Sequence, residues 1–133
     1  MAMRPIHFEI QADDPERAAE FYRTVFGWDI KKWDSDQMEY WVVMTDKKES
    51  TEMGINGGLL RRPAKTPNEQ CGTNAYVCTM GVENFDEIEK KILRAGGKVA
   101  MPKFALAGMA WQGYFLDTEN NTFGIHQPDK DAK

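Results

Sequence analysis

The sequence has little of what several common kinds of functional site require. Its 133 residues include two cysteines, Cys71 and Cys78, and two histidines, His7 and His126. Two cysteines form neither a disulfide framework nor a zinc signature, so a cytoplasmic location is the default expectation. The chain also lacks a Walker loop, a Rossmann glycine fingerprint and a Gly-x-Ser-x-Gly elbow. These absences exclude the most easily recognised classes of nucleotide-binding protein, hydrolase and zinc domain.

An excess of basic charge and a long apolar run are absent as well. Lysine and arginine number 17 against 21 acidic residues, which gives a net charge of −4. A general nucleic-acid binder would normally show a basic face, and so would a protein that binds anionic membranes. The longest apolar runs are about five residues, far below the ~20 needed to span a bilayer. Neither a nucleic-acid partner nor a membrane partner is therefore expected.

The sequence does contain an internal repeat. In each half, an apolar strand-like run precedes a helix-like segment that stops at a glycine. An offset of 69 residues carries Gly27 onto Gly96, and the same offset carries His7 onto Tyr76. Two copies of one unit usually enclose a groove, where small-molecule chemistry is commonly found.

Local signals place the elements of both halves. Ile6 to Gln11 alternates apolar and polar side chains as a strand does. Asp13 or Asp14 caps the first helix and Asn84 caps the second. Further strands are expected near 28–30, 40–44, 54–60, 73–79, 98–101, 111–116 and 122–127, and residues 128–133 are expected to be a frayed tail.

This pattern predicts one α+β domain over residues 1–133, built from two βαβββ modules. Module one spans about 5–60, a linker about 61–72, and module two about 73–127. Strands outnumber what two helices need for a parallel βαβ sheet, so the strands should be mostly antiparallel. We expect the two modules to form an open barrel-like cup with both helices outside.

The chain resembles the vicinal-oxygen-chelate superfamily, which includes glyoxalase I, bleomycin-resistance proteins and extradiol dioxygenases. The residues that carry the resemblance are His7-Phe8-Glu9-Ile10, Asp14-Pro15-Glu16-Arg17-Ala18, Phe21-Tyr22, Phe26-Gly27-Trp28, Ala95-Gly96-Gly97-Lys98-Val99 and Asp117-Thr118-Glu119-Asn120-Asn121-Thr122-Phe123-Gly124. The resemblance covers nearly the whole chain. It implies the fold but no single reaction, because this scaffold carries many functions.

The resemblance also implies four positions where enzymes of the superfamily hold a divalent metal. These positions fall at His7, at or near Tyr76, in Gly57-Gly58 and at Gly124. Only His7 offers a suitable donor, whereas a catalytic site of this kind needs about three protein ligands. The leading interpretation is therefore that the chain has no metal cofactor. The alternative is a divalent metal ion held by a displaced set made of His7, Glu9 and His126, in which strand alternation puts His7 beside Glu9.

The leading functional hypothesis is a glyoxalase-like or bleomycin-resistance-like protein that binds a small organic molecule in the cup. The predicted substrate-binding residues are His7, Trp41, Gly58, Tyr76, Tyr114 and His126. Glycine would leave space for a ligand, and aromatic side chains with a polar atom suit such pockets. No residue is assigned a catalytic role. The alternatives are a metal-dependent lyase, isomerase or dioxygenase of the same superfamily, and an accessory domain whose cup is filled by its own side chains, such as Trp41 and Trp111.

A homodimer is the expected assembly. Members of the superfamily with two modules often pair, and a twofold symmetric dimer is the commonest closed oligomer.

Overall fold

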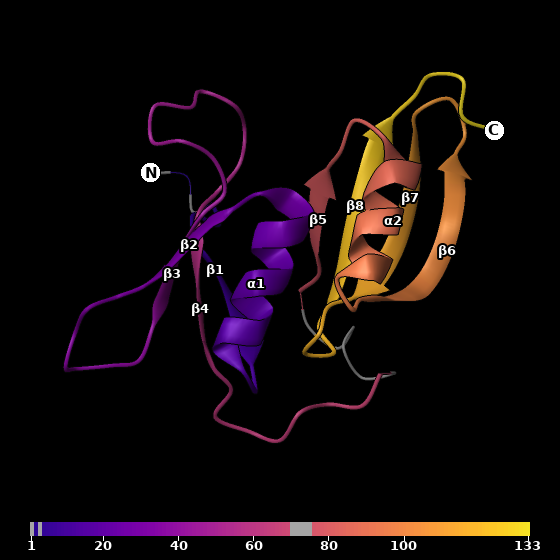
Figure 1. Ribbon diagram of the computed structural model, residues 1–133. Coiled ribbons are helices and arrows are strands. Elements are labelled where there is room, and N and C mark those ends of the chain that lie inside the picture. Colours follow the sequence, from indigo (N-terminus) through magenta and orange to yellow (C-terminus); the bar gives the residue numbers. More distant parts are fainter. Residues whose placement is uncertain (1, 3, 70–75) are drawn as a thin grey trace. The chain divides into compact units, whose positions relative to one another are not determined.

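The computed structural model describes all residues except 1, 3 and 70–75. The chain divides into two compact units, residues 1–66 and 67–133 (Figure 1). Each unit contains one helix and one four-stranded sheet, in the order βαβββ. The predicted α+β class and the two modules are therefore confirmed.

The first unit contains β1 (Phe8–Ala12), α1 (Pro15–Phe26), β2 (Asp29–Lys32), β3 (Trp41–Met44) and β4 (Gly57–Arg61). Its strands lie in the order β1-β4-β3-β2. Only β1 and β4 run parallel, while the other two pairs are antiparallel. The predicted strand 54–60 is thus shorter at its beginning than expected and starts at Gly57.

Helix α1 covers one face of this sheet. Asp14 is its N-cap and accepts a hydrogen bond from the backbone N–H of Arg17, and Pro15 takes the first helical position. Gly27 ends the helix in the left-handed region, at φ 72°. The helix buries Ala18, Phe21, Tyr22 and Val25 on the side of the sheet where Ile30, Trp41, Val43 and Leu59 are also buried.

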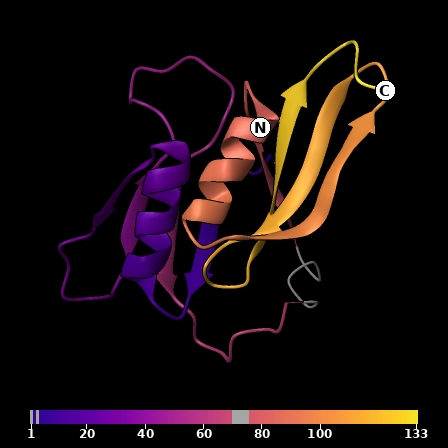
Figure 2. The same cartoon turned by 45° about the vertical axis from the view of Figure 1, so that its right-hand side comes forward.

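The second unit contains β5 (Cys78–Gly81), α2 (Phe85–Arg94), β6 (Lys98–Leu106), β7 (Ala110–Leu116) and β8 (Thr122–Pro128). The strand order is β5-β8-β7-β6, and the one parallel pair is again formed by the first and last strands. Each helix lies along one face of its own sheet in a second view (Figure 2). In this unit Phe85 and Ile92 of α2 are fully buried together with Phe115, Phe123 and Ile125.

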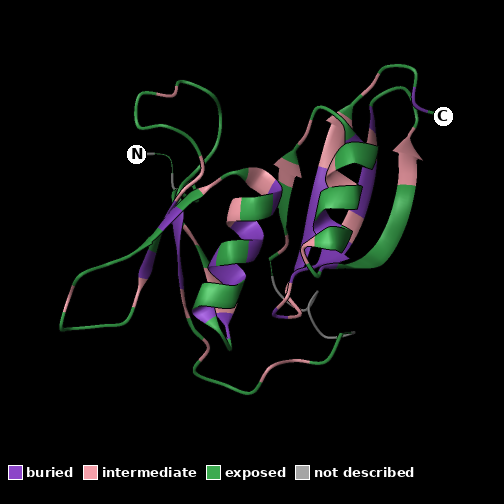
Figure 3. Cartoon of the chain, viewed as in Figure 1, coloured by how far each residue is buried: buried purple, intermediate pink, exposed green. Residues whose placement is uncertain are grey.

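The burial pattern separates the central strands from the edge strand of the second unit. Strands β7 and β8 are mostly buried, whereas β6 is exposed over its first six residues (Figure 3). Pro102 interrupts the β6 ladder, and register shifts flank it between Val99 and Met101 and between Met101 and Phe104. A proline and a bulge on an edge strand both discourage pairing with another chain.

The C-terminal segment is not frayed, which corrects one expectation from the sequence. The backbone N–H of Asp129 donates to Met109 O at 2.8 Å, and Gly108 donates to Ala132 O at 2.8 Å. Trp111 Nε1 also donates to Asp129 Oδ2, and Ala132 is 2% exposed. The segment packs against the β6–β7 turn, which sequence periodicity does not reveal. Among the described residues, no helix is both long enough and apolar enough to cross a membrane.

Candidate functional site

Three polar side chains meet on the sheet face of the first unit that is turned away from α1. We call this the helix-free face; in this unit it carries His7, Glu9, Tyr40, Val42 and Gly58. The Tyr40 hydroxyl donates to Glu9 Oε2 at 2.9 Å, and His7 Nε2 lies 2.9 Å from the same hydroxyl oxygen. The structure thus brings His7 and Glu9 together around a residue that the sequence analysis did not select.

Gly58 makes this arrangement possible. Glu9 pairs with Gly58 across β1 and β4, and Gly58 pairs with Val42 of β3. Tyr40 directly precedes β3 and lies diagonally across from Gly58, a position from which a long aromatic side chain can reach it. A Cβ atom at Gly58 would lie only 1.8 Å from the Tyr40 hydroxyl oxygen. The space predicted for a ligand above Gly58 is therefore filled by the Tyr40 side chain.

The environment keeps the Tyr40 hydroxyl protonated. Burial raises the pKa of Tyr40 to about 12, and the hydrogen bond to Glu9 and the negative charge of Glu9 act in the same direction. An ionised carboxylate can only accept hydrogen bonds, so the Tyr40 hydroxyl uses its single proton to donate the hydrogen bond to Glu9. His7 Nε2 must then be the donor to Tyr40, which leaves Nδ1 of the neutral imidazole as an acceptor.

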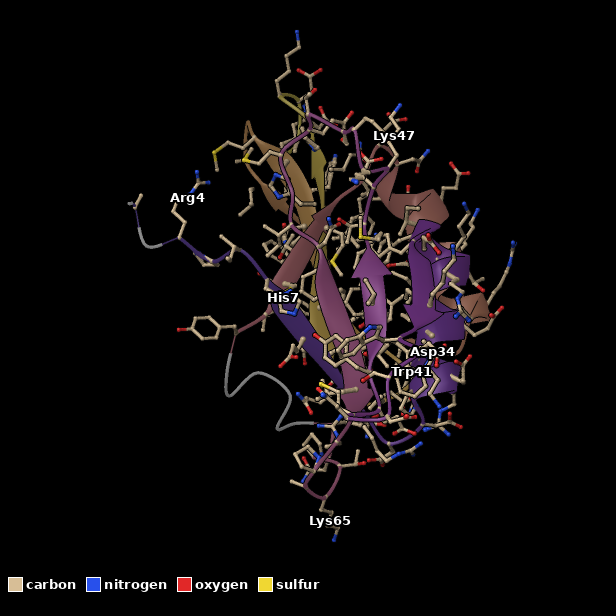
Figure 4. All side chains as sticks on the ribbon, turned by 90° about the vertical axis from the view of Figure 1, so that its left-hand side faces the viewer. Arg4, His7, Asp34, Trp41, Lys47 and Lys65 are labelled. Atoms are coloured by element: carbon tan, nitrogen blue, oxygen red, sulfur yellow. The ribbon has the colours of Figure 1, made fainter. Side chains whose placement is uncertain are left out.

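Trp41 lies on the opposite face of the same sheet. Its side chain is 2% exposed, and its Nε1 donates to Glu16 Oε1 of α1 at 2.6 Å. Figure 4 shows Trp41 on the side of α1 and His7 on the other side. The structure does not bring Trp41 together with His7. Alternation along residues 40–44 puts Trp41 on the face opposite Tyr40 and Val42, which is the face that carries His7.

The helix-free face of the second unit carries a comparable cluster, made of Gln112, Tyr114, Gly124 and His126. His126 Nδ1 lies 2.8 Å from Gln112 Oε1. The amide oxygen can only accept, so Nδ1 donates and Nε2 of the neutral ring becomes an acceptor. Gln112 is 5% exposed and lies over Gly124, where a Cβ atom would be 3.0 Å from both its Nε2 and Tyr114 Cε1. Here the predicted residues Tyr114 and His126 do lie together.

Tyr76 is not part of this cluster. It precedes β5, and its side chain is 101% exposed. Thr79 pairs with Gly124 as Glu9 pairs with Gly58, so the offset between β1 and β5 is 70 residues rather than 69. Val77, and not Tyr76, therefore occupies the place of His7. The offset of 69 came from the helix ends and does not extend to the strands.

Cys78 contributes no reactive thiolate to either cluster. Desolvation raises the pKa of the Cys78 thiol, which favours the unreactive protonated form. Cys71 lies outside the described residues, as does the predicted strand segment 73–75.

The residues at the superfamily's metal positions do not fit a metal ion. Gly58 and Gly124 offer no donor, and neighbouring side chains fill the space above them. His7 uses Nε2 for Tyr40, and Val77 replaces a ligand in the second unit. Within the described residues, no group of three or more His, Cys, Asp or Glu side chains could hold a metal ion. Of the displaced set, His7 and Glu9 belong to the first unit and His126 to the second.

Sequence reasoning also missed Trp33, a second residue of the first helix-free face beside Tyr40. Trp33 donates its backbone N–H to Tyr40 O at 2.7 Å, just beyond the pairing of Lys32 with Trp41. Alternation therefore places the Trp33 side chain beside Tyr40, where it is 45% exposed. Neither Trp33 nor Tyr40 carries a motif, and only the strand register could have revealed them.

Comparison with known proteins supports the fold. Residues 4–46 match the family model described as bleomycin resistance protein-like N-terminal. No curated protein sequence matches the chain closely enough to count as a relative.

Several solved structures share the architecture. A variant of the fosfomycin resistance protein FosX from Listeria monocytogenes, complexed with Mn(II) and 1S,2S-dihydroxypropylphosphonic acid, superposes with TM-score 0.72 and 15% identity over 97% of this chain and 93% of that one. TnmS3, an antibiotic binding protein from Streptomyces sp. CB03234, superposes with TM-score 0.67 and 21% identity over 97% of this chain and 99% of that one. A glyoxalase/bleomycin resistance protein/dioxygenase family enzyme from Burkholderia phytofirmans PsJN superposes with TM-score 0.68 and 15% identity over 92% of this chain and 97% of that one. The chain thus has the fold of the vicinal-oxygen-chelate superfamily, and residues 4–46 of its first unit match the bleomycin-resistance-like family model.

Proposed function

We propose that the protein binds a small organic molecule through the helix-free faces of its sheets and does so without a metal ion. The observation that carries the proposal is the pair of hydrogen-bonded clusters, each built over a glycine at a position where the superfamily places a metal ligand. In each cluster a histidine is held by a neutral side chain, Tyr40 or Gln112. The protein's own polar groups thus replace the metal as fixed recognition points.

The arrangement has the features of a binding site for organic molecules. Such sites combine apolar surface with a few polar groups whose orientation is fixed in advance. The Tyr40 hydroxyl fixes both His7 and Glu9, and Gln112 fixes His126. Val42 is 40% exposed beside the first cluster and provides apolar surface. The likeness to TnmS3, an antibiotic binding protein, and to FosX, a fosfomycin resistance protein, supports the use of antibiotics as probes.

A binding assay with and without metal tests the proposal. Protein dialysed against EDTA is mixed with metal-free bleomycin, and the melting temperature is measured before and after Mn(II) is added. A ligand present at 100 times its Kd adds about 2.7 kcal/mol of stability, which raises Tm by several degrees. We expect a rise in the metal-free sample that is reduced in His7→Ala and unchanged in the exposed control Lys65→Ala.

Other outcomes would favour the alternatives. A stoichiometric divalent metal in freshly purified protein, with a Tm rise only after Mn(II) is added, would support the metal-dependent enzyme. The accessory domain would be supported if a broad panel of organic molecules left Tm unchanged.

The homodimer stays a prediction with its own test. The chain has a mass of 15.2 kDa, so light scattering after size-exclusion chromatography distinguishes one copy from two. A mass equal to a single chain at micromolar concentration would contradict it.

A further inference from the structure

The hydrogen-bond pattern of the first cluster indicates which chemical class it recognises. Glu9 Oε2 accepts a hydrogen bond from the Tyr40 hydroxyl, and the carboxylate retains lone pairs on Oε1. His7 donates Nε2–H to Tyr40, which leaves Nδ1 of the neutral ring as an acceptor. Two exposed side chains anchored to one hydroxyl oxygen thus present acceptors to a bound molecule. A matching ligand must supply hydrogen-bond donors.

The charges on this face favour a cation. By alternation and pairing, Asp29 and Lys31 of β2 lie on the same face, since they pair with Met44 and Val42. Asp29 and Lys31 form an ion pair with each other at 3.4 Å. The charges of Asp29 and Lys31 offset each other, so Glu9 is the one charged side chain that β1 and β2 place on this face outside an ion pair. An anionic group such as a phosphonate or a carboxylate would meet acceptors and a negative charge.

Apolar surface lies next to the acceptors. Val42 is 40% exposed and Trp33 is 45% exposed, and both are neighbours of Tyr40 on this face. An exposed indole and a phenol ring offer flat surfaces that attract organic cations and bury hydrocarbon. The ligand body that suits this surface is small, flat and apolar.

We propose that the helix-free face of the first unit binds a protonated amine or amidinium carried on a flat apolar body. Its N–H groups are held by Glu9 and His7, and its body lies against Val42 and Trp33. This inference rests on the proposed function and specifies its ligand class. Tyr40 acts as a positioning residue, because it fixes the directions of the two acceptors without needing to touch the ligand.

Three compounds of nearly the same shape provide the test. Benzamidinium is a cation with several N–H donors, benzamide is its neutral counterpart, and benzoate is an anion with acceptors only. Each is titrated into ¹⁵N-labelled full-length protein, and Kd is obtained from amide shift changes. We expect benzamidinium to bind at least tenfold more tightly than either analogue, with shifts concentrated at residues 7–9, 31–33 and 40–42. Equal or tighter binding of benzoate would overturn the inference.

Variants locate the charge that is responsible. Glu9→Gln should weaken benzamidinium binding by tenfold or more, since hydrogen bonds to charged groups contribute about 1.5–3 kcal/mol. Glu49→Gln makes the same charge change at an exposed position in the same unit and should change Kd less than twofold. Tyr40→Phe should alter the His7 ring ¹⁵N shifts towards a mixture of tautomers and weaken binding. Equal losses in Glu9→Gln and Glu49→Gln would show a general charge effect and contradict the site.

The outcomes also separate this inference from the proposed function. If metal-free bleomycin binds and benzamidinium shows no preference over benzamide, the ligand class is wrong while the proposed function stands. If Mn(II) alone binds, at stoichiometric levels, both are wrong.

Discussion

Gly57 and Gly58 are two single residues whose missing side chains leave space on opposite faces of β4. A Cβ atom at Gly57 would lie 2.4 Å from the Phe8 backbone oxygen and 2.8 Å from the Phe8 ring, and one at Gly58 would meet Tyr40 on the helix-free side. Phe8 belongs to β1, and Tyr40 directly precedes β3. The dipeptide therefore serves the packing of two rings, and the second ring organises the His7–Glu9 pair.

The substitution Gly58→Ala tests this role. The new methyl group would lie 1.8 Å from the Tyr40 hydroxyl oxygen, so the ring must move and its bonds to His7 and Glu9 must break. Inserting a methyl group into such a packed position costs about 1–3 kcal/mol, measured by urea denaturation. Gly54→Ala is the matched control, because no atom lies within 4 Å of its added Cβ. An equally stable Gly58→Ala protein would contradict the packing described for Tyr40.

Tyr40 also gives the protein a pH dependence at high pH. Its pKa is raised from 10.0 to about 12 in the folded state, first by burial and then by Glu9. Between these pH values the folded protein retains a proton that the unfolded chain has lost. The stabilising contribution is therefore complete below pH 10 and is lost as the pH rises towards 12.

Ultraviolet titration at 295 nm measures this directly. The wild-type protein should show a late phenolate step near pH 12 whose amplitude falls in Tyr40→Phe. Tyr76→Phe removes a fully exposed tyrosine and should keep the late step. A late step of unchanged amplitude in Tyr40→Phe would assign it to another tyrosine, such as the buried Tyr22, and would contradict this account.

At the scale of the element, the helices were predictable because their signals are local. Caps, a proline at the first helical position and a terminal glycine act within a few residues of the helix that they bound. Asp14 and Asn84 cap the two helices with the same geometry, each accepting from the N–H three residues later at 3.1 Å. The strands were located less accurately, since their ends depend on partners that are distant in the sequence.

Asn84→Ala measures the contribution of one cap. The side chain accepts a hydrogen bond from the backbone N–H of Glu87, and its loss leaves a helix donor without that partner. We expect unfolding free energy to fall by about 1 kcal/mol and amide exchange to accelerate in α2. Asn84→Asp keeps an acceptor at the same place and should restore most of the loss. Unchanged exchange in α2 with Asn84→Ala would mean that this cap has no net effect.

At the scale of the whole molecule, the sequence predicted the architecture better than the site. The repeat and the helix signals led to two βαβββ units, and alternation correctly paired His7 with Glu9. Tyr40 and Trp33 were missed because their importance depends on a diagonal contact and on one hydrogen bond across the β2–β3 turn. Tyr76 was selected through an offset that differs by one residue between helix ends and strands. Side chains placed by strand register could be identified only once the register was known.

The C-terminal segment likewise depended on contacts that a linear pattern does not show. The sequence of residues 128–133 predicts a charged, frayed tail. In the structure, however, Asp129 forms hydrogen bonds with both Met109 and Trp111, and Ala132 O accepts a hydrogen bond from Gly108. All of these contacts lie within the second unit. Residues 129–133 therefore complete the packing of the β6–β7 turn of that unit.

Removal of residues 129–133 should destabilise the second unit selectively. Three hydrogen bonds of about 1 kcal/mol each are lost, so we expect a decrease of roughly 2–3 kcal/mol. Hydrogen exchange followed residue by residue should show faster exchange in β6 and β7, while α1 and β4 keep their protection. Lys130→Ala alters an exposed side chain in the same segment and should leave exchange unchanged. If the shortened protein kept full protection in β6 and β7, the segment would have no part in holding the turn.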